Sequence, residues 1–579
     1  MIENLFSSKV MFLVLETLFD HPEESMSTTE IIERTGKHQT SVMRELEKLA
    51  GWKLVTKKRV GNLNHFRLDQ DSPSFVPLKK LFDEYSKIGG GYFLIAEEGG
   101  VSLLSLHYFT RGYTSDYAVK KGVISSVSEI ICHYQDDYGR FYFEKEHYER
   151  CGRESFDKLI EDPSFVEELI YKESVEYGEQ ALEIYGRLKQ EGFRMGKRQA
   201  VEMLQKFEEI IARQISLGYI AVFDLKDQRY SKYLKGYLSE RIDGTELKLH
   251  ATLQKLLEPT ETTHTQRLHS VMVNLAIESK SGNTGTDSEL RRIWRDWLWL
   301  NYGYRGPAYD FDYFQQVLDE LCNKDKAELR REAAELKEHA DKIIREKDRL
   351  CSKLGIDKEH RKFIDALSQL SFLKVYRKDT AFLLIYMTYE ILKQFNRKYK
   401  QKELYYLTLD EAVELIEGRL KVSRSELRKR EHNSVYLGKE EKILLGKEAD
   451  KYVDLMVGKE EAQVAKNGQL RMLEGMTACL GRTGDWVRGK VKIINVSEDM
   501  DKMEDGDILI SVTTTPDILP AMKKASAIVT DHGGITCHAA VVSRELDIPC
   551  LIAVKYATKV FKDGDAVIVC PRHGYIKYQ

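Results

Sequence analysis

Proline, paired cysteines, long apolar runs and an excess of charge are all scarce in this sequence. Only 10 of its 579 residues are proline, so long segments lack helix breakers and we expect a largely helical body. The eight cysteines include no Cys-x-x-Cys pair, which argues against a disulfide framework or a zinc site and for a reducing cytoplasm. The longest apolar stretch, residues 381–392, is too short to span a bilayer, and the N-terminus has no secretory signal. We therefore expect a cytoplasmic protein with no bound metal and no membrane association.

Basic and acidic side chains nearly cancel, 89 against 92, which leaves a net charge of -3. No chain-wide positive field therefore attracts nucleic acid, and any such site has to be local. A length of 579 residues corresponds to about four typical domains, and 42% hydrophobic residues are enough for packed cores. We predict a multidomain, mainly α protein with three parts, at residues 1–87, 92–470 and 475–579.

Residues 1–87 are predicted to form three helices followed by a strand, a turn and a second strand. Apolar residues recur at helical spacing in residues 10–18, 31–32 and 42–49, which is a helix-turn-helix layout. Two strands separated by a Gly61-Asn62 turn follow, as expected of a wing. Six basic residues and no acidic one lie in residues 48–67, so positive charge gathers on these strands.

The string TGKHQTSVMRELEKLAGWKLV, followed by a Gly-Asn turn, resembles the winged helix-turn-helix domains of bacterial and archaeal transcriptional regulators. That resemblance implies a DNA-binding helix and a phosphate-binding wing. The residues it assigns to the major groove are Gln39, Thr40, Ser41 and Arg44, and those it assigns to phosphates are Lys57, Lys58 and Arg59. A winged helix used only for dimerisation or protein docking is the alternative, and we expect a homodimer.

Residues 92–470 are predicted to be a long helical domain. Three tryptophans, Trp294, Trp297 and Trp299, fall within six positions, where they either fill a core or stack on a ligand. The segment from Gly192 to Arg198 is similar to a phosphate loop but lacks its spacing and the Ser or Thr after the lysine, so we discount it.

From about residue 475 the pattern changes to short apolar runs separated by Gly and Asp, which predicts a compact α/β domain of about 100 residues. The expected strands lie at residues 490–494, 506–510, 527–530, 550–554 and 566–569, with one helix at 537–546.

The string TDHGGITCHAAVVSREL, residues 530–546, carries the strongest chemical signal in the chain. A strand ends at Thr530, Gly533 and Gly534 permit an unusual backbone geometry, and a helix begins near Thr536, which can cap it. His538 is then in the first helical turn, where unpaired N–H groups and the helix dipole favour a phosphoryl group on the imidazole. Glycines before a helix are common, and a lone histidine is usually structural, so the full string carries the argument.

This string resembles the phosphohistidine signature of the phosphoenolpyruvate-utilising enzymes, in which a swivelling domain carries phosphate between two active sites. The resemblance covers roughly residues 475–579 and implies that His538 is the nucleophile, because a neutral imidazole suits that role near pH 7. Asp531 and His532 stand where phosphoenolpyruvate synthases carry other polar residues, and an orienting role for both is conjecture. Arg544 follows the family pattern and is expected to support the fold.

The middle of the chain has a second, fainter resemblance. Residues 302–307 and 404–411 are similar to the helical domain of rifampicin phosphotransferase-like proteins. Tyr304 stands where that family has a histidine, which puts a catalytic use of the position in doubt. Arg305 and Asp410 are then candidates to line a small-molecule cleft, with ion pairs between helices as the equal alternative.

No nucleotide-binding domain of the ATP-grasp kind and no phosphoenolpyruvate-binding barrel is recognisable, so no cofactor site is assigned within this chain. We expect ATP or phosphoenolpyruvate to donate the phosphoryl group through a separate protein, and a small molecule to accept it. The first hypothesis is therefore that the protein is a phosphotransferase component. Whether this chain is an enzyme without its partner stays open. The alternative is a DNA-binding transcriptional regulator whose state is set by phosphorylation of His538.

Overall fold

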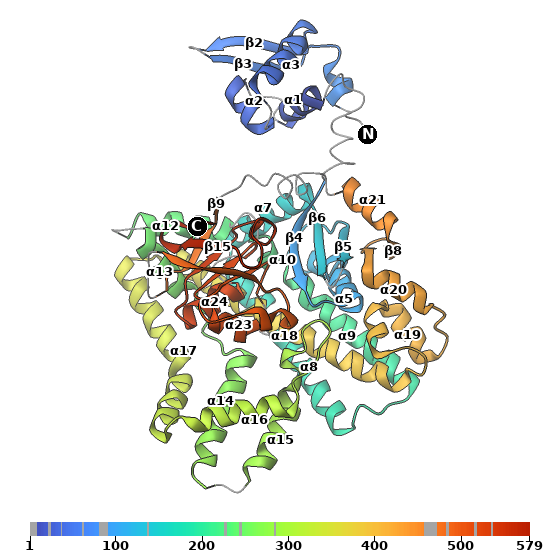
Figure 1. Ribbon diagram of the computed structural model, residues 1–579, viewed down its shortest axis with the longest axis vertical. Helices are drawn as coiled ribbons and strands as arrows, with labels where there is room; N and C mark the ends of the chain where they lie inside the picture. Colours follow the sequence, from blue (N-terminus) through green and yellow to red (C-terminus); the bar gives the residue numbers. More distant parts are fainter. Residues whose placement is uncertain are drawn as a thin grey trace. The chain divides into compact units, whose positions relative to one another are not determined.

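A computed structural model shows two compact units, one comprising residues 1–91 with 454–458 and the other comprising residues 92–453 with 459–579 (Figure 1). The structure describes residues 9–20, 25–35, 38–60, 63–79, 91–135, 138–224, 229–242, 246–282, 285–456, 472–481, 486–514, 518–533 and 537–579. The chain is mainly helical, with an α/β region at its C-terminal end.

The first unit contains three helices and a small antiparallel sheet. The elements are α1 (Lys9–Asp20), β1 (Met26–Ser27), α2 (Thr28–Thr35), α3 (Gln39–Gly51), β2 (Val55–Val60) and β3 (Leu63–Leu68), with strand order β1-β3-β2. Val14, Leu46 and Phe66 are fully buried and belong to one apolar cluster, so the helices pack on the sheet. The helices and strands lie where the apolar spacing predicts them. The predicted Gly61-Asn62 turn lies outside the described residues.

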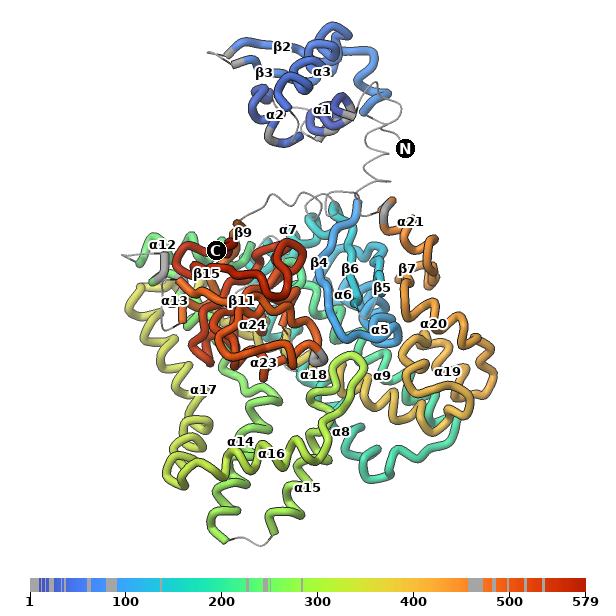
Figure 2. Tube along the Cα trace, in the orientation of Figure 1, coloured from blue at the N-terminus to red at the C-terminus, as the bar shows by residue number. Residues whose placement is uncertain are grey.

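The second unit contains a five-stranded antiparallel sheet that the sequence did not predict. Its strands are β4 (Tyr92–Gly99), β5 (Ile130–Gln135), β6 (Tyr138–Glu144), β7 (Asn433–Leu437) and β8 (Lys442–Leu445), in the order β4-β6-β5-β7-β8. The expectation of a helical domain at 92–470 therefore missed this sheet. Residues Ile130 to Tyr134 are all buried, and such a continuous apolar run has no period that distinguishes a strand from a buried helix. β7 completes the sheet from about 300 residues further along the chain, and Figure 2 shows the two segments side by side.

Helices make up the rest of the segment between residues 92 and 456. They are α5 (Leu103–Thr114), α6 (Tyr117–Lys120), α7 (Lys145–Glu161), the π-helix η2 (Val166–Tyr171), α8 (Lys172–Gln190), α9 (Lys197–Leu217), α10 (Tyr219–Val222), α12 (Arg229–Ser239), α13 (Glu246–Leu257), α14 (His264–Ser279), α15 (Thr286–Trp297), the 3-10 helix η3 (Leu298–Asn301), α16 (Phe311–Asn323), α17 (Lys326–Leu354), α18 (Lys358–Phe395), the 3-10 helix η4 (Gln401–Tyr406), α19 (Leu409–Glu417), α20 (Arg424–His432) and α21 (Lys447–Met456). The 38-residue helix α18 is buried along most of its length, from Phe363 to Leu392, so it is the central element of this unit. Trp299 is fully buried, in agreement with the core interpretation.

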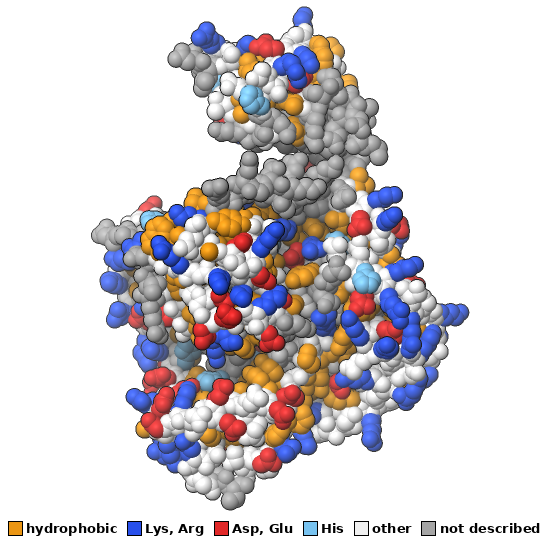
Figure 3. Space-filling view, viewed as in Figure 1, with side chains coloured by type: hydrophobic (Ala, Val, Ile, Leu, Met, Phe, Trp, Pro, Cys, Tyr) orange, Lys and Arg blue, Asp and Glu red, His pale blue; other side chains and the backbone are white. Residues whose placement is uncertain are grey.

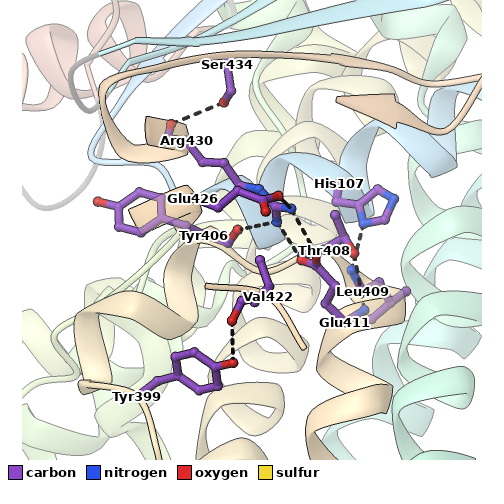
Figure 4. A network of polar contacts seen from close by, with 10 residues as sticks. All are labelled: His107, Tyr399, Tyr406, Thr408, Leu409, Glu411, Val422, Glu426, Arg430 and Ser434. Carbon is purple, nitrogen blue, oxygen red and sulfur yellow. Dashed lines mark hydrogen bonds and ion pairs between the residues drawn. The ribbon is translucent and has the colours of Figure 1, made fainter. Parts of the chain in front are cut away.

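A buried ion-pair network joins η4, α19 and α20 (Figure 4). The Arg430 guanidinium donates to Glu411 at 2.6 and 2.9 Å, to Glu426 at 2.6 Å and to the Tyr406 carbonyl at 3.1 Å. His107 accepts a hydrogen bond from the backbone N–H of Leu409 at 2.8 Å, which ties α5 to the start of α19. Residues 404–411 thus have an architectural role here.

The last part of the second unit is built on an eight-stranded sheet in the order β10-β14-β13-β12-β11-β15-β16-β9. Its elements are β9 (Met472–Glu474), β10 (Met476–Cys479), β11 (Val487–Ile493), the 3-10 helix η5 (Ser497–Lys502), β12 (Ile508–Ser511), α23 (Leu519–Lys524), β13 (Ala527–Thr530), α24 (His538–Glu545), β14 (Cys550–Ile552), α25 (Ala557–Val560), β15 (Ala566–Cys570), the 3-10 helix η7 (Pro571–His573) and β16 (Tyr575–Tyr578). Strands β11 to β14 run parallel. All five predicted strands and the helix are present, while β9, β10 and β16 were missed.

The two faces of this sheet are buried in different ways. Leu509 and Ile528 belong to the large apolar cluster that also contains Ala539 and Ala540 of α24 and the buried residues of α18. Ile508 and Val529 point to the opposite face and pack with α25. The apolar core therefore continues from the helical body into the C-terminal domain, and this packing positions α24.

Candidate functional site

His538 is the first residue of α24, which begins directly after the loop that follows β13. Gly533 in that loop has φ +135°, and a Cβ there would lie 2.8 Å from the Cys537 Sγ atom. Only glycine fits such a position without strain. The N-cap is Cys537, which makes no side-chain cap bond. Gly534 and Thr536, the residue predicted to cap the helix, lie outside the described residues.

The imidazole of His538 is oriented by one hydrogen bond. Its Nδ1 atom lies 2.9 Å from the Thr514 Oγ1 atom, and Thr514 is buried in the loop after β12. Among the described residues, no partner is found for Nε2, so this is the ring nitrogen free to react. Burial, reinforced by the positive charge of Lys378, lowers the pKa of His538 to about 3. The side chain is therefore neutral and nucleophilic at physiological pH.

Lys378 belongs to a cavity of about 180 Å³ in the helical body. The cavity lies between the five-stranded sheet, α5, the junction of α9 and α10, and α18. Apolar side chains form most of its wall, and its lining includes Ile95, Phe109, Phe141, Ile215 and Tyr304. The Thr513 hydroxyl donates to the Glu97 carbonyl at 3.4 Å. The loop after β12, whose Thr514 contacts His538, is therefore fixed to strand β4 beside this cavity.

Three basic residues of α18, Lys374, Arg377 and Lys378, line the cavity. Their i, i+3 and i+4 spacing places them on one helix face. The Lys378 Nζ atom lies 3.0 and 3.2 Å from the Glu98 carboxylate oxygens, and Glu98 also lines the cavity. Lys374 interacts electrostatically with Cys537, the residue before His538. The reactive histidine and the basic side of the cavity therefore lie close together.

The structure places Asp531 away from the role predicted for it. Its carboxylate accepts hydrogen bonds from the Thr558 hydroxyl and from the Thr558 N–H at 3.1 Å, which anchors α25. Burial raises the pKa of Asp531 to about 6. The His532 backbone N–H donates to the Val512 carbonyl at 3.0 Å. The hydrogen bond that the structure shows for the His538 ring is the one with Thr514.

Some of the other residues singled out in the sequence make contacts within the fold, and others line a cavity. Arg544 donates from Nε to the Ala540 carbonyl at 2.6 Å, in keeping with a role in the fold. Tyr304 lines the cavity, although it replaces a histidine of the family string. Asp410 fits both predicted alternatives, an ion pair between helices and a small-molecule cleft. It pairs with Arg111 at 2.8 Å, and it lines a second cavity, of about 170 Å³, between α9 and α19. Arg305 lines neither cavity.

Sequence reasoning missed the basic face of α18. A signal was present, because Lys374, Arg377 and Lys378 directly precede the longest apolar stretch of the chain, residues 381–392. Charged residues are almost never fully buried unless they are paired or functional. Glu98 and the aromatic walls gave no comparable signal, since they come from segments hundreds of residues apart.

In the first unit, the residues predicted to contact DNA lie mainly on the surface. Gln39, Thr40, Arg44, Lys57, Lys58 and Arg59 are exposed, and Ser41 is half-buried. Figure 3 shows basic side chains on the visible face of this unit. Lys57 forms an ion pair with Glu47 of α3, and Arg44 lies 3.2 Å from Glu45, so part of the positive charge is neutralised.

Two negative findings concern the described part of the chain. No three His, Cys, Asp or Glu side chains gather there in a way that could hold a metal ion. Every helix in the same residues is too short or too polar to cross a lipid bilayer.

Residues 503–574 match the family described as the mobile domain of PEP-utilising enzymes. A probable phosphoenolpyruvate synthase of Archaeoglobus fulgidus is 48% identical over 117 residues, which are 20% of this chain and 15% of that protein. The phosphoenolpyruvate synthase of Escherichia coli is 48% identical over 90 residues, which are 16% of this chain and 11% of that protein. The chain thus spans less than a fifth of the length of the curated relatives that it matches. The likeness is consistent with phosphotransfer through a histidine.

Proposed function

We propose that the protein is a phosphotransferase component in which His538 carries a phosphoryl group from a donor on another protein to a small molecule in the α18 cavity. The observation that carries this proposal is the position of a neutral histidine, at the start of a helix, beside a basic cavity. The similarity of residues 503–574 to the mobile domain of PEP-utilising enzymes supports it.

The chemistry proposed for His538 is a two-step displacement. In the first step the Nε2 lone pair attacks the phosphorus atom of ATP or phosphoenolpyruvate, the N–P bond forms, and the donor's P–O bond breaks with its electron pair on the leaving oxygen. Thr514 holds Nδ1 during this step. Unpaired N–H groups at the start of α24 and the charge of Lys378 stabilise the phosphoryl group. In the second step an acceptor oxygen attacks the phosphorus and the N–P bond breaks.

The two steps require two positions of the C-terminal domain. In this structure His538 faces the helical body, so the arrangement corresponds to delivery to the acceptor. Loading would need the domain to move toward a donor site, as in swivelling domains. Splitting the transfer in this way replaces one difficult displacement by two easier ones.

Phosphorylation with labelled ATP and labelled phosphoenolpyruvate, with and without cell extract, tests the proposal. We expect an acid-labile, base-stable adduct on the peptide that contains His538, absent from His538→Ala. His573→Ala is the matched control, because His573 is exposed on η7 in the same domain. Equal labelling of the His538→Ala protein would contradict the proposal.

A second function, DNA binding by a winged helix in the first unit, is supported by the exposed polar face of α3 and the basic strand β2. We expect binding to duplex DNA that weakens steeply with salt, because such binding releases counterions from the phosphates. Replacing Lys57, Lys58 and Arg59 together by Gln should weaken it, whereas replacing three exposed lysines of α17 should not.

The comparison is measured by fluorescence anisotropy on one duplex over a range of salt concentrations. An unchanged affinity in the triple variant, or no binding to any duplex at low salt, would favour the docking or dimerisation alternative.

A further inference from the structure

Arg377 is a buried cation without a carboxylate partner among the described residues. Its side chain is packed against the turn between α9 and α10, where a Cβ on Gly218 would lie 1.8 Å from the Arg377 Nη1 atom. Its hydrogen bonds go to two carbonyl oxygens, from Nε to Leu373 at 3.0 Å and from Nη1 to Gln214 at 3.0 Å. Arg377 is 7% exposed and lines the cavity.

An unpaired buried charge is expensive, so its retention calls for a compensating interaction. Burial lowers the pKa of Arg377 only to about 10, and the guanidinium therefore stays charged at neutral pH. The other cations of the cavity have different surroundings. Lys374 interacts electrostatically with Asp224 and Cys537. Lys378 is paired with Glu98 and lies 5.3 Å from the centre of the Tyr304 ring. Arg377 is the cation whose partner has to come from outside the described residues.

The cations of the cavity have different neighbours. Lys378 and Glu98 lie close to His538, since the charge of Lys378 lowers the pKa of that histidine. Arg377 lies near Tyr113 and Gly218. Apolar side chains form most of the wall around these groups, and a cavity of about 180 Å³ is large enough for a ring-sized body, because about 150 Å³ suffices for benzene.

We propose that this cavity binds a small organic anion whose charged group pairs with Arg377 and whose apolar body lies against the aromatic walls. Guanidinium groups pair with carboxylate and phosphate by parallel hydrogen bonds, so either group satisfies the site. The inference deepens the proposed function, on which its second part rests: a hydroxyl at the other end of the ligand is the phosphoryl acceptor.

In that second part the ligand's hydroxyl oxygen attacks the phosphorus on His538. The O–P bond forms, the N–P bond breaks, and Nε2 recovers the electron pair. The hydroxyl proton goes to the Glu98 carboxylate, which has Lys378 as its counter-ion. Binding of the anion itself requires no phosphorylation, so it is measured separately.

The test uses the unphosphorylated full-length protein and ligand-observed NMR with matched pairs: benzoate and benzamide, phenylacetate and phenylacetamide, with phenyl phosphate as the phosphate probe. We expect the acids to bind at least tenfold more tightly than their amides. Tighter binding of phenyl phosphate than of benzoate identifies the preferred anion as a phosphate, and the reverse identifies it as a carboxylate. Equal binding of acid and amide, or no binding of any of the three anions, overturns the inference.

Variants locate the binding. Arg377→Gln should abolish the preference for acids, and Arg361→Gln is its control, because Arg361 lies on the same helix but pairs with Asp348 and Asp365. Val222→Phe fills the cavity without removing a charge and should abolish binding, which keeps the test decisive if Arg377→Gln does not fold. Anion binding that survives both substitutions overturns the inference.

His538→Ala separates the two proposals. That variant should still bind the anion, since Arg377 and the apolar walls are unchanged. If it binds and the wild-type protein is never phosphorylated, the proposed function fails and the binding site stands. If the wild-type protein is phosphorylated but prefers no acid over its amide, the site fails and the function stands.

Discussion

A histidine that acts as a nucleophile near neutral pH has to remain unprotonated. Two features keep His538 in this state: burial against the helical body and the charge of Lys378. Because the folded-state pKa of about 3 lies below the usual 6.5, the unfolded chain binds an extra proton between these values. The contribution of His538 to the free energy of unfolding therefore decreases as the pH falls below about 6.5.

Replacing Lys378 by Met tests the electrostatic part of this account. A nearby positive charge disfavours the imidazolium, so its removal should raise the pKa of His538. Glu98 then loses its counter-ion, which shifts the pKa in the same direction. Burial remains the larger cause, so the pKa should stay below 6.5. The measurement is an NMR titration of histidine-labelled protein, with the signal assigned by His538→Ala.

Lys393→Met is the control for this titration. Lys393 lies on the same helix but pairs with Glu390 and does not line the cavity. Its replacement should leave the His538 titration unchanged. An unaltered or lower pKa in Lys378→Met would show that Lys378 does not act on the histidine.

At the scale of elements, the loop before α24 depends on a conformation that only glycine adopts easily. Gly533→Ala meets both an unfavourable φ and the Cys537 Sγ atom at 2.8 Å. We expect a loss of about 1 to 3 kcal/mol in unfolding free energy and slower phosphorylation, because the loop positions the start of α24. Thermal unfolding and the rate of adduct formation check both parts.

Gly186→Ala is the matched control. Gly186 lies inside α8, where an added Cβ would meet no atom within 4 Å, and it does not have a positive φ. The substitution should stabilise the helix by about 0.5 to 1 kcal/mol and leave adduct formation unchanged. Equal effects of the two substitutions would contradict a special role for the loop.

Elements with a local sequence pattern could be predicted, and elements that depend on distant pairing could not. Strands β12 to β15 are short apolar runs bounded by Gly, Asp or Pro, and β11 ends in alternating Lys and apolar residues, so local patterns suffice to place them. The sheet of β4 to β8 is different, because β7 joins β5 from about 300 residues away and the His133 side chain contacts Asn433 there. No local pattern contains that pairing.

The candidate site likewise has one part that could be predicted from the sequence and one part that could not. His538 was predicted because the pattern around it is one contiguous string, residues 530–546. The cavity was not, because Glu98, Phe141, Gly218, Tyr304 and Arg377 come from five separate segments that only the fold brings together. The contact of Thr514 was not predicted, since its partner His538 lies 24 residues further along the chain.

At the scale of the whole molecule, basic and acidic side chains are intermixed on the face shown in Figure 3, in keeping with a net charge of -3. No chain-wide positive field therefore attracts DNA, and any DNA-binding site has to be local. The chain joins this unit to a second unit that contains His538. Physical coupling between the two is the simplest reason for such a fusion, if both sites work.

The coupling hypothesis predicts that phosphorylation of His538 changes the affinity of the protein for DNA. A modification can shift binding only as far as it distinguishes two conformations, and typical couplings are about 1 to 3 kcal/mol, or roughly 5- to 150-fold. The phosphoryl group adds negative charge at the surface where α24 packs on the body, so it should favour a different docking of the C-terminal domain. Titrations of one duplex with phosphorylated protein, unphosphorylated protein and His538→Ala measure the effect. We expect the variant to match the unphosphorylated protein, and identical isotherms for all three would mean that the two units are merely tethered.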